Sequence, residues 1–326
     1  MLAVVLVFVN AFFFLKMKII RHLIAFVAMI VAIPAMVAAD SYALVNISTA
    51  YVRSKPSHSA ELVTQQLMGF PVKIVETQGE WSRVETIDGY DGYIINNTLH
   101  AITTQEYDAW KCTPRVIVKS NKELAITNCC GRQVSDVVPG AILVLDDDCG
   151  GDTTIVNVLL PDKRKGALPV DVVMPLEQWR AQPLAIDQII SYGMDNLGAP
   201  YLWGGMSPKG MDCSGLTWTA FWLNGRLLKR DASKQALMGA KITDWHCLKA
   251  GDLAFFGNPA TLRISHVALL RDDNGNIVHS SGGRVRLNSL DPAAPDCISA
   301  KFLWGISADN LLPIAEDAKA SWLFSL

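Results

Sequence analysis

Residues 210–215 read GMDCSG and join a glycine- and proline-rich loop, residues 198–211, to an apolar run at residues 213–223. This junction predicts a helix that begins at Cys213. A thiol at a helix N-terminus meets unpaired backbone N–H groups and the positive end of the helix dipole, and both favour the thiolate. Cys213 is therefore a candidate nucleophile. The alternative is a buried core cysteine in an apolar helix.

Two histidines follow on segments that are typical of strands. His266 lies in residues 264–270, His279 lies in residues 277–280, and the sequence DNGN at 273–276 between them is a strong hairpin signal. Antiparallel pairing across this turn is expected to bring His279 beside His266. Cys213 would then be the nucleophile, His266 its base, and His279 the group that orients His266.

A metal centre is the rival interpretation of the two histidines. The sequence contains neither a His-Glu-x-x-His helix nor a paired Cys-x-x-Cys motif. We therefore expect no metal and no other cofactor. The formal net charge of −2 and the lack of basic runs argue against a nucleic-acid partner.

The rest of the chain separates into regions by pattern. Short strand-like runs joined by turns fill residues 40–105 and again 106–174, with a helical connector at 104–113. A helical run at 184–197 and then the histidine-bearing strands occupy residues 175–326. The predicted architecture is two small all-β barrels of SH3 type followed by one α+β domain.

Residues 1–39 have the composition of a secretory signal. The basic sequence KMKIIR at 16–21 precedes an apolar run at 23–37, and Ala38-Ala39 stands before Asp40. Met17 would make an ordinary start for such a signal. The alternative is a membrane anchor, but residues 2–15 are few for a bilayer span. We expect export to the periplasm or beyond, without stable membrane insertion after cleavage.

The seven cysteines are an odd number, so at least one thiol is left over if disulfides form after export. Their pairing stays open.

Several motifs together resemble the NlpC/P60 family of cysteine peptidases. They occur in the family's order across residues 183–310, and Cys213 stands 53 residues before His266 and His266 stands 13 before His279. The motifs are GAPYLWGG (198–205), DCSGL (212–216), RDASKQ (230–235), AGDLAFF (250–256), SHVA (265–268) and IVHS (277–280). The sequences SAELVTQ (59–65) and DGYDGYI (88–94) resemble bacterial SH3 domains, and residues 115–174 are less typical of them.

This resemblance implies a papain-like α+β fold and hydrolysis of γ-D-glutamyl bonds in peptidoglycan stem peptides. Two SH3-type domains before the catalytic one resemble the YkfC-like branch, whose members release L-Ala-γ-D-Glu from stems with a free amine. The catalytic triad implied for this sequence is Cys213, His266 and His279.

Further substrate-binding residues are implied around the nucleophile. The Tyr201 hydroxyl would assist the oxyanion or the substrate, and Trp203, Asp212 and Ser214 would contact the substrate. Loop packing is the alternative for Tyr201 and Trp203, and helix capping is the alternative for Asp212 and Ser214.

An aminopeptidase-like pocket must neutralise the ammonium of the substrate. Asp212 and, by resemblance, Glu61 could supply a carboxylate for this purpose. Tyr90 could supply a hydroxyl acceptor and form one wall of the pocket. Asp231 would pair with Arg230 to fix the pocket. The alternatives are a solvated Glu61, a Tyr90 that packs in its barrel, and a solvated Arg230–Asp231 pair.

Three other functions stay open. The protein could be an endopeptidase on intact wall, a wall-peptide-binding protein with an inert catalytic domain, or an amidase or acyl transferase that uses the same thiol. The sequence does not distinguish diaminopimelate from lysine at the third stem position, nor does it fix the oligomeric state.

Overall fold

The computed structural model describes residues 41–146 and 153–325. The leader at 1–39 and Cys149 lie outside these ranges. Residues from Asp40 to Leu326 form one compact unit. In the part of the chain that is described, no helix is long and apolar enough to cross a membrane.

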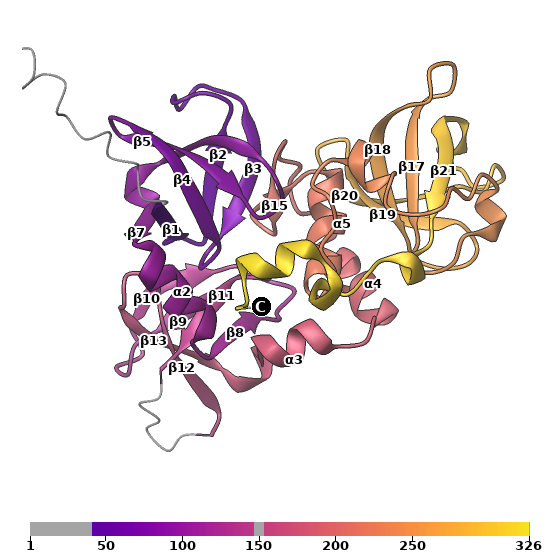
Figure 1. The fold of residues 1–326 in the computed structure, drawn as a ribbon. Helices are drawn as coiled ribbons and strands as arrows, with labels where there is room; N and C mark the ends of the chain where they lie inside the picture. The colour runs from indigo at the N-terminus through magenta and orange to yellow at the C-terminus, as the bar shows by residue number, and fades with distance from the viewer. Residues whose placement is uncertain (1–40, 147–152, 326) are drawn as a thin grey trace, which may run out of the picture. The chain divides into compact units, whose positions relative to one another are not determined.

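The first region is a seven-stranded antiparallel sheet in the order β3-β2-β6-β5-β4-β1-β7 (Figure 1). Side chains alternate between its two faces, and alanine, valine and isoleucine fill the inner one. The strands are β1 (Ser41–Val45), β2 (Thr49–Arg53), β3 (Leu62–Leu67), β4 (Pro71–Gln78), β5 (Trp81–Thr86), β6 (Asp91–Ile95) and β7 (Leu99–Ile102).

The second region repeats this topology. Its sheet order, β10-β9-β13-β12-β11-β8-β14, is that of the first sheet strand for strand. The strands are β8 (Arg115–Val118), β9 (Leu124–Thr127), β10 (Gln133–Val137), β11 (Ile142–Leu145), β12 (Ile155–Leu159), β13 (Lys165–Pro169) and β14 (Val173–Pro175). The prediction of two successive small all-β folds is confirmed, including the one whose sequence is less typical. We call them the first and second barrels.

Helix α2 (Thr104–Cys112) connects the barrels, as predicted. Thr103 and Glu106 form a capping box at its N-terminus, which explains where it begins.

The third region has helices first and strands after, which confirms the predicted α+β class. Its sheet runs β20-β19-β18-β17-β21. The helices are α3 (Leu176–Ala181), α4 (Ile186–Asp195), α5 (Cys213–Trp222) and α6 (Ala232–Gln235). The strands are β15 (Met206–Ser207), β16 (Gly210–Met211), β17 (Leu253–Asn258), β18 (Arg263–Leu270), β19 (Asn276–Ser281), β20 (Arg284–Ser289) and β21 (Phe302–Ile306).

Short 3-10 helices complete the described chain. They are Asn96–Thr98, Val170–Val172, Trp245–Cys247, Ser299–Lys301, Ala308–Asn310, Ile314–Glu316 and Ala318–Trp322. The last two belong to a C-terminal tail for which the sequence analysis made no prediction. Leu323 and Phe324 are buried there, and the carbonyl of Trp322 accepts a hydrogen bond from the Tyr107 hydroxyl at 2.8 Å.

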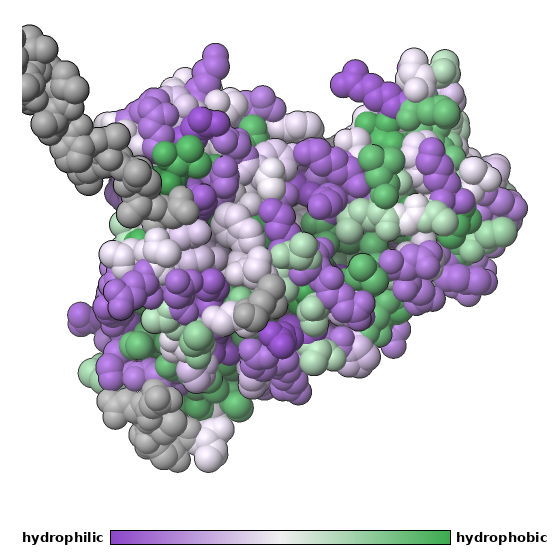
Figure 2. All heavy atoms as spheres, viewed as in Figure 1, coloured by the Kyte–Doolittle hydropathy of each residue, from purple (hydrophilic) through white to green (hydrophobic). Residues whose placement is uncertain are grey.

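Aromatic residues of α5 join all three regions in one core. Every residue of α5 is buried. Trp222 lies with its ring centroid 5.2 Å from that of Phe70 in the first barrel, and its Nε1 donates to the carbonyl of Gly140 in the second barrel at 2.9 Å. Large aromatic surfaces contribute strongly to core stability, so the barrels are fixed to the helix that carries Cys213. On the face in Figure 2, hydrophobic side chains lie in small groups among hydrophilic ones.

Candidate active site

Cys213 is the first residue of α5, as predicted from the sequence. Asp212 caps the helix, because its Oδ1 accepts a hydrogen bond from the Gly215 N–H at 2.7 Å. The thiol is 8% exposed. Burial, and after it the charge of Asp212, raise the pKa of Cys213 to about 11, although the backbone N–H groups of Val267 and Ser214 act in the opposite direction.

The expected thiolate is therefore not the resting state. The helix N-terminus does favour the charged form, but the loss of solvation on burial is larger. The Val267 N–H that faces the sulfur belongs to β18, directly after His266, and α5 packs on β18. The thiol thus lies beside the strand that carries the candidate base.

The two histidines meet across the β18–β19 hairpin. His266 Nε2 lies 2.6 Å from His279 Nδ1. Burial and then the neighbouring His279 lower the pKa of His266 to about 3, and burial also lowers the pKa of His279. Both rings are neutral in the resting site, where each has one N–H donor and one acceptor.

A residue absent from the sequence-based site fixes which nitrogen carries each proton. Asn288 Nδ2 donates to the carbonyl of Asp296, and its Oδ1 lies 2.9 Å from His279 Nε2. A carbonyl only accepts, so the amide orientation is determined, and His279 Nε2 must donate to Asn288 Oδ1. His279 Nδ1 then accepts from His266 Nε2. This leaves Nδ1 of His266 without a proton, so it can accept one.

Asp212 and Ser214 lie in a buried hydrogen-bond network. The Asp212 carboxylate binds Arg230 through both oxygens, at 3.0 and 2.7 Å, and also accepts from the backbone of Gly204 and Gly215. Ser214 Oγ donates to Asp212 and accepts from Arg230. The contact of Asp212 and Ser214 with the substrate stays a prediction, and the helix capping given as its alternative is observed for Asp212.

Arg230 connects this network to the first barrel. Its Nε donates to Thr64 Oγ1 of β3 at 3.0 Å, and its side chain is 2% exposed. The expected Arg230–Asp231 pair is wrong, because the guanidinium turns inward to Asp212. Asp231 instead accepts a hydrogen bond from the Tyr90 hydroxyl of the first barrel and pairs with Lys234 at 3.2 Å.

Glu61 also reaches the catalytic region. Trp203 Nε1 donates to Glu61 Oε1 at 3.0 Å, and the Trp203 side chain is 60% exposed. The neighbouring Gly204 has a left-handed φ of +76°, and a Cβ there would lie 2.7 Å from the carbonyl oxygen of Leu62. Glycine at 204 thus allows the loop to contact β3 of the first barrel.

Tyr201 stands at the edge of the same site. Its N–H donates to the carbonyl of Gly283 at 2.9 Å. Burial, and then the neighbouring Cys213 and Asp212, raise the pKa of Tyr201 to about 12, so its hydroxyl remains a donor at neutral pH. This is the state that the proposed oxyanion role requires.

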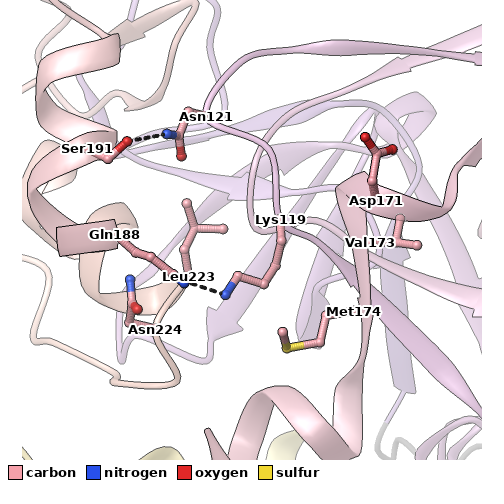
Figure 3. A pocket seen from close by; sticks show the side chains of 9 residues that line it. All are labelled: Lys119, Asn121, Asp171, Val173, Met174, Gln188, Ser191, Leu223 and Asn224. Carbon is pink, nitrogen blue, oxygen red and sulfur yellow. Dashed lines mark hydrogen bonds between the residues drawn. The ribbon is translucent and has the colours of Figure 1, made fainter. Parts of the chain in front are cut away.

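A separate cavity of about 390 Å³ lies between the second barrel and α4 (Figure 3). Its Lys119 ammonium donates to Gln182 and Gln188, and its Asn121 amide donates to Ser191 and Asp195. None of the candidate site residues lines it, and two pairs of its polar side chains, Lys119–Gln188 and Asn121–Ser191, bind each other.

Comparison with known proteins gives the same family as the motifs. The profile of the NlpC/P60 family matches residues 198–296, and that of the bacterial SH3 domain matches residues 48–100. Dipeptidyl-peptidase 6 of Lysinibacillus sphaericus is 30% identical over 263 residues, which are 78% of this chain and 93% of that protein. The chain belongs to the NlpC/P60 family. Members of this family are cysteine peptidases, and so is this protein.

Two further similarities extend over most of the chain. Gamma-D-glutamyl-L-lysine dipeptidyl-peptidase of Bacillus subtilis is 42% identical over 229 residues, 67% of this chain and 71% of that protein. The crystal structure of an NlpC/P60 family protein from Bacillus cereus aligns with a TM-score of 0.70 at 26% identity, over 81% of this chain and 98% of that one. The predicted combination of SH3-type barrels and a papain-like NlpC/P60 domain is confirmed.

Proposed function

We propose that this peptidase hydrolyses the bond between γ-D-Glu and the L-diamino acid of peptidoglycan stem peptides and releases L-Ala-γ-D-Glu. The observation that carries the proposal is the contact of the first barrel with the catalytic loops, through Glu61 to Trp203 and Tyr90 to Asp231. These two hydrogen bonds support the proposal, because each joins a residue of the first barrel to a loop of the third region that carries a predicted substrate-binding residue. Relatives named dipeptidyl-peptidases support the same activity.

The proposed chemistry uses Cys213, His266 and His279. The Cys213 thiol gives its proton to Nδ1 of His266 as the sulfur attacks the γ-carbonyl carbon of D-Glu. Tyr201 donates a hydrogen bond to the developing oxyanion. His266 then protonates the leaving amine of the diamino acid, and a thioester of L-Ala-γ-D-Glu remains on Cys213. Water, deprotonated by His266, hydrolyses the thioester. A base with a lowered pKa returns its proton readily.

The amine end of the substrate would bind at the barrel. Glu61 and Asp231 supply negative charge for the L-Ala ammonium, and Tyr90 and Trp203 form the wall of the subsite. Asp212, which the sequence also offered for this role, is already neutralised by Arg230. A free amine is then a condition for tight binding, so released stem peptides are better substrates than intact wall.

We also propose that residues 1–39 direct export and are removed before Asp40. The basic segment, the apolar run and the small residues support this proposal. N-terminal sequencing of the protein from its native cells tests it. A mature chain that begins at Met1 or Met17 contradicts it.

The activity test compares L-Ala-γ-D-Glu-diaminopimelate with its N-acetylated form and with the same stem attached to muramic acid, and identifies products by mass spectrometry. We expect L-Ala-γ-D-Glu from the free peptide. Equal rates on all three substrates would indicate an endopeptidase on intact wall, and the absence of products would indicate a binding protein.

Glu61→Ala should raise KM for the free peptide about tenfold, the lower end for one charge-assisted contact, because Glu61 is exposed. Glu61→Gln is the matched control, since it retains an acceptor for Trp203 and removes only the charge. If the negative charge of Glu61 binds the ammonium, both variants lose affinity for the free peptide, and N-acetylation of the peptide does not raise KM further in either variant. A wild-type KM in Glu61→Gln would refute the ammonium subsite.

A further inference from the structure

Two arginines of the edge strand β20 have no ionic partner. Arg284 and Arg286 are exposed, and within residues 41–146 and 153–325 neither forms a salt bridge or a side-chain hydrogen bond. Several other arginines of the molecule do have carboxylate partners: Arg83 with Asp91, Arg164 with Asp162, Arg180 with Glu177, Arg230 with Asp212 and Arg271 with Asp272. Two unpaired guanidinium groups two residues apart form a local positive charge.

These arginines share a face with the catalytic histidine pair. In β20, Arg284, Arg286 and Asn288 alternate with Val285 and Leu287, so the three point to the same side. Asn288 binds His279 on that side, and Arg286 is the direct cross-strand neighbour of His279. The positive charge of Arg286 also acts to lower the pKa of His279, so the two groups are close in space.

The β19–β20 hairpin is held firmly against the nucleophile loop. Val285 exchanges backbone hydrogen bonds with Gly198 and Ala199 at 2.9 and 2.8 Å, and the Gly283 carbonyl accepts from Tyr201. Ser280 Oγ donates to the Met211 carbonyl at 2.7 Å. Nη1 of Arg286 lies near the turn, 3.3 Å from where a Cβ on Gly282 would stand. The backbone that carries the two arginines is therefore fixed beside the loop of Tyr201, and the Arg286 guanidinium lies near the turn.

We propose that Arg284 and Arg286 form a subsite that binds a free carboxylate of the stem peptide. The inference rests on the proposed function and specifies its substrate class. A γ-linked D-Glu retains a free α-carboxylate, and diaminopimelate carries a side-chain carboxylate where lysine has only an ammonium. Guanidinium groups bind carboxylates in two-pronged geometry and repel an ammonium. Both carboxylates have the same chemistry, and the experiment separates them.

Binding is measured by calorimetry in the Cys213→Ala protein, so that no peptide is consumed. Four ligands are used: L-Ala-γ-D-Glu-diaminopimelate, its L-Lys counterpart, and the α-carboxamide of each at D-Glu. The double variant Arg284→Gln, Arg286→Gln is compared with Arg132→Gln. Arg132 is an exposed arginine of the β9–β10 hairpin in the second barrel, and its side chain has no ion pair in the described structure. Its variant controls for the loss of positive charge in general.

We expect the unsubstituted arginines to give about tenfold tighter binding of the ligand that carries the recognised carboxylate, a difference that weakens with added salt. The double variant should lose this preference, and Arg132→Gln should retain it. Loss of the preference for diaminopimelate over lysine identifies the side-chain carboxylate. Loss of the preference for D-Glu over its amide identifies the α-carboxylate.

Three results would overturn the inference: unchanged preferences in the double variant, equal weakening for all four ligands, or no binding of any of them. Cleavage by the protein with Cys213 intact is assayed in parallel. If the peptides bind with an arginine-dependent preference but are not cut, the proposed activity fails and the carboxylate subsite stands. If they are cut at equal rates with and without the two arginines and bind without preference, the subsite fails and the activity stands.

Discussion

Replacing Arg230 by methionine should strongly destabilise the protein. The Arg230 and Asp212 side chains are 2% and 8% exposed and share two hydrogen bonds, and Arg230 also binds Thr64 and Ser214. Removal of one partner of a buried ion pair leaves an uncompensated charge and costs about 3–5 kcal/mol. Because domains are stable by about 5–15 kcal/mol, this is a large share of the free energy of unfolding.

The assay is urea unfolding followed by tryptophan fluorescence, since Trp218 and Trp222 of the nucleophile helix α5 are fully buried. Arg83→Met is the matched control: its bidentate pair with Asp91 also lies in the described structure, but the two side chains are 41% and 46% exposed, and water screens them. We expect a much smaller loss there.

A second variant tests the cause. Adding Asp212→Asn to Arg230→Met removes the buried charge, and asparagine still caps α5. Stability should recover in part. The reasoning is refuted if Arg230→Met unfolds at the same urea concentration as Arg83→Met, or if the double variant is no more stable than Arg230→Met alone.

The remaining predictions concern catalysis. Cys213→Ala should fold yet lose essentially all turnover, with His266→Ala nearly as low, because a triad acts as a unit; a tenth of wild-type rate in the first would exclude the assignment. His279→Gln should retain more activity than His279→Ala, measured as kcat/KM. Asn288→Asp keeps an acceptor for the His279 N–H and should exceed Asn288→Leu in kcat; equal values would contradict the proton assignment. Because the pKa of Cys213 is raised to about 11, its thiolate fraction grows with pH up to that value, so iodoacetamide labelling of Cys213, followed by peptide mass spectrometry, should accelerate steadily from pH 7 to 10. A plateau below pH 8 would show an activated thiolate.

The parts of the site that the sequence predicted depend on short-range patterns. A loop-to-helix junction determines the position of Cys213, and one hairpin determines the meeting of His266 and His279. Both are visible within a few tens of residues. The first barrel was predictable in the same way, from short apolar runs and the turns between them, and the resemblance to a family supplied Glu61.

The parts that the sequence missed depend on long-range packing. Arg230 donates a hydrogen bond to Thr64, which lies 166 residues earlier in the chain. Its pairing with Asp212 rather than with the adjacent Asp231 therefore could not be predicted from the local sequence. Asn288 lies in β20, a strand with only two apolar positions, and its contact with His279 follows from strand register. The ionisation of Cys213 depends on burial by distant segments, which outweighs the local helix effect.

The first barrel makes direct contacts with the candidate active site, which a binding module on a flexible tether would not make. Thr64 accepts a hydrogen bond from Arg230, which neutralises the helix-capping Asp212, and the Tyr90 hydroxyl donates to Asp231. The same barrel therefore supports both the nucleophile helix and the side of the site where the amine is proposed to bind. A substrate too large to enter between them would have to separate contacts that include the buried hydrogen bond from Arg230 to Thr64. Opening would therefore be costly, and a small free peptide, the substrate that we propose, would require none. In the proposed function, selection of the substrate by size and by charge would then have one structural origin, the packing of the first barrel on the catalytic loops.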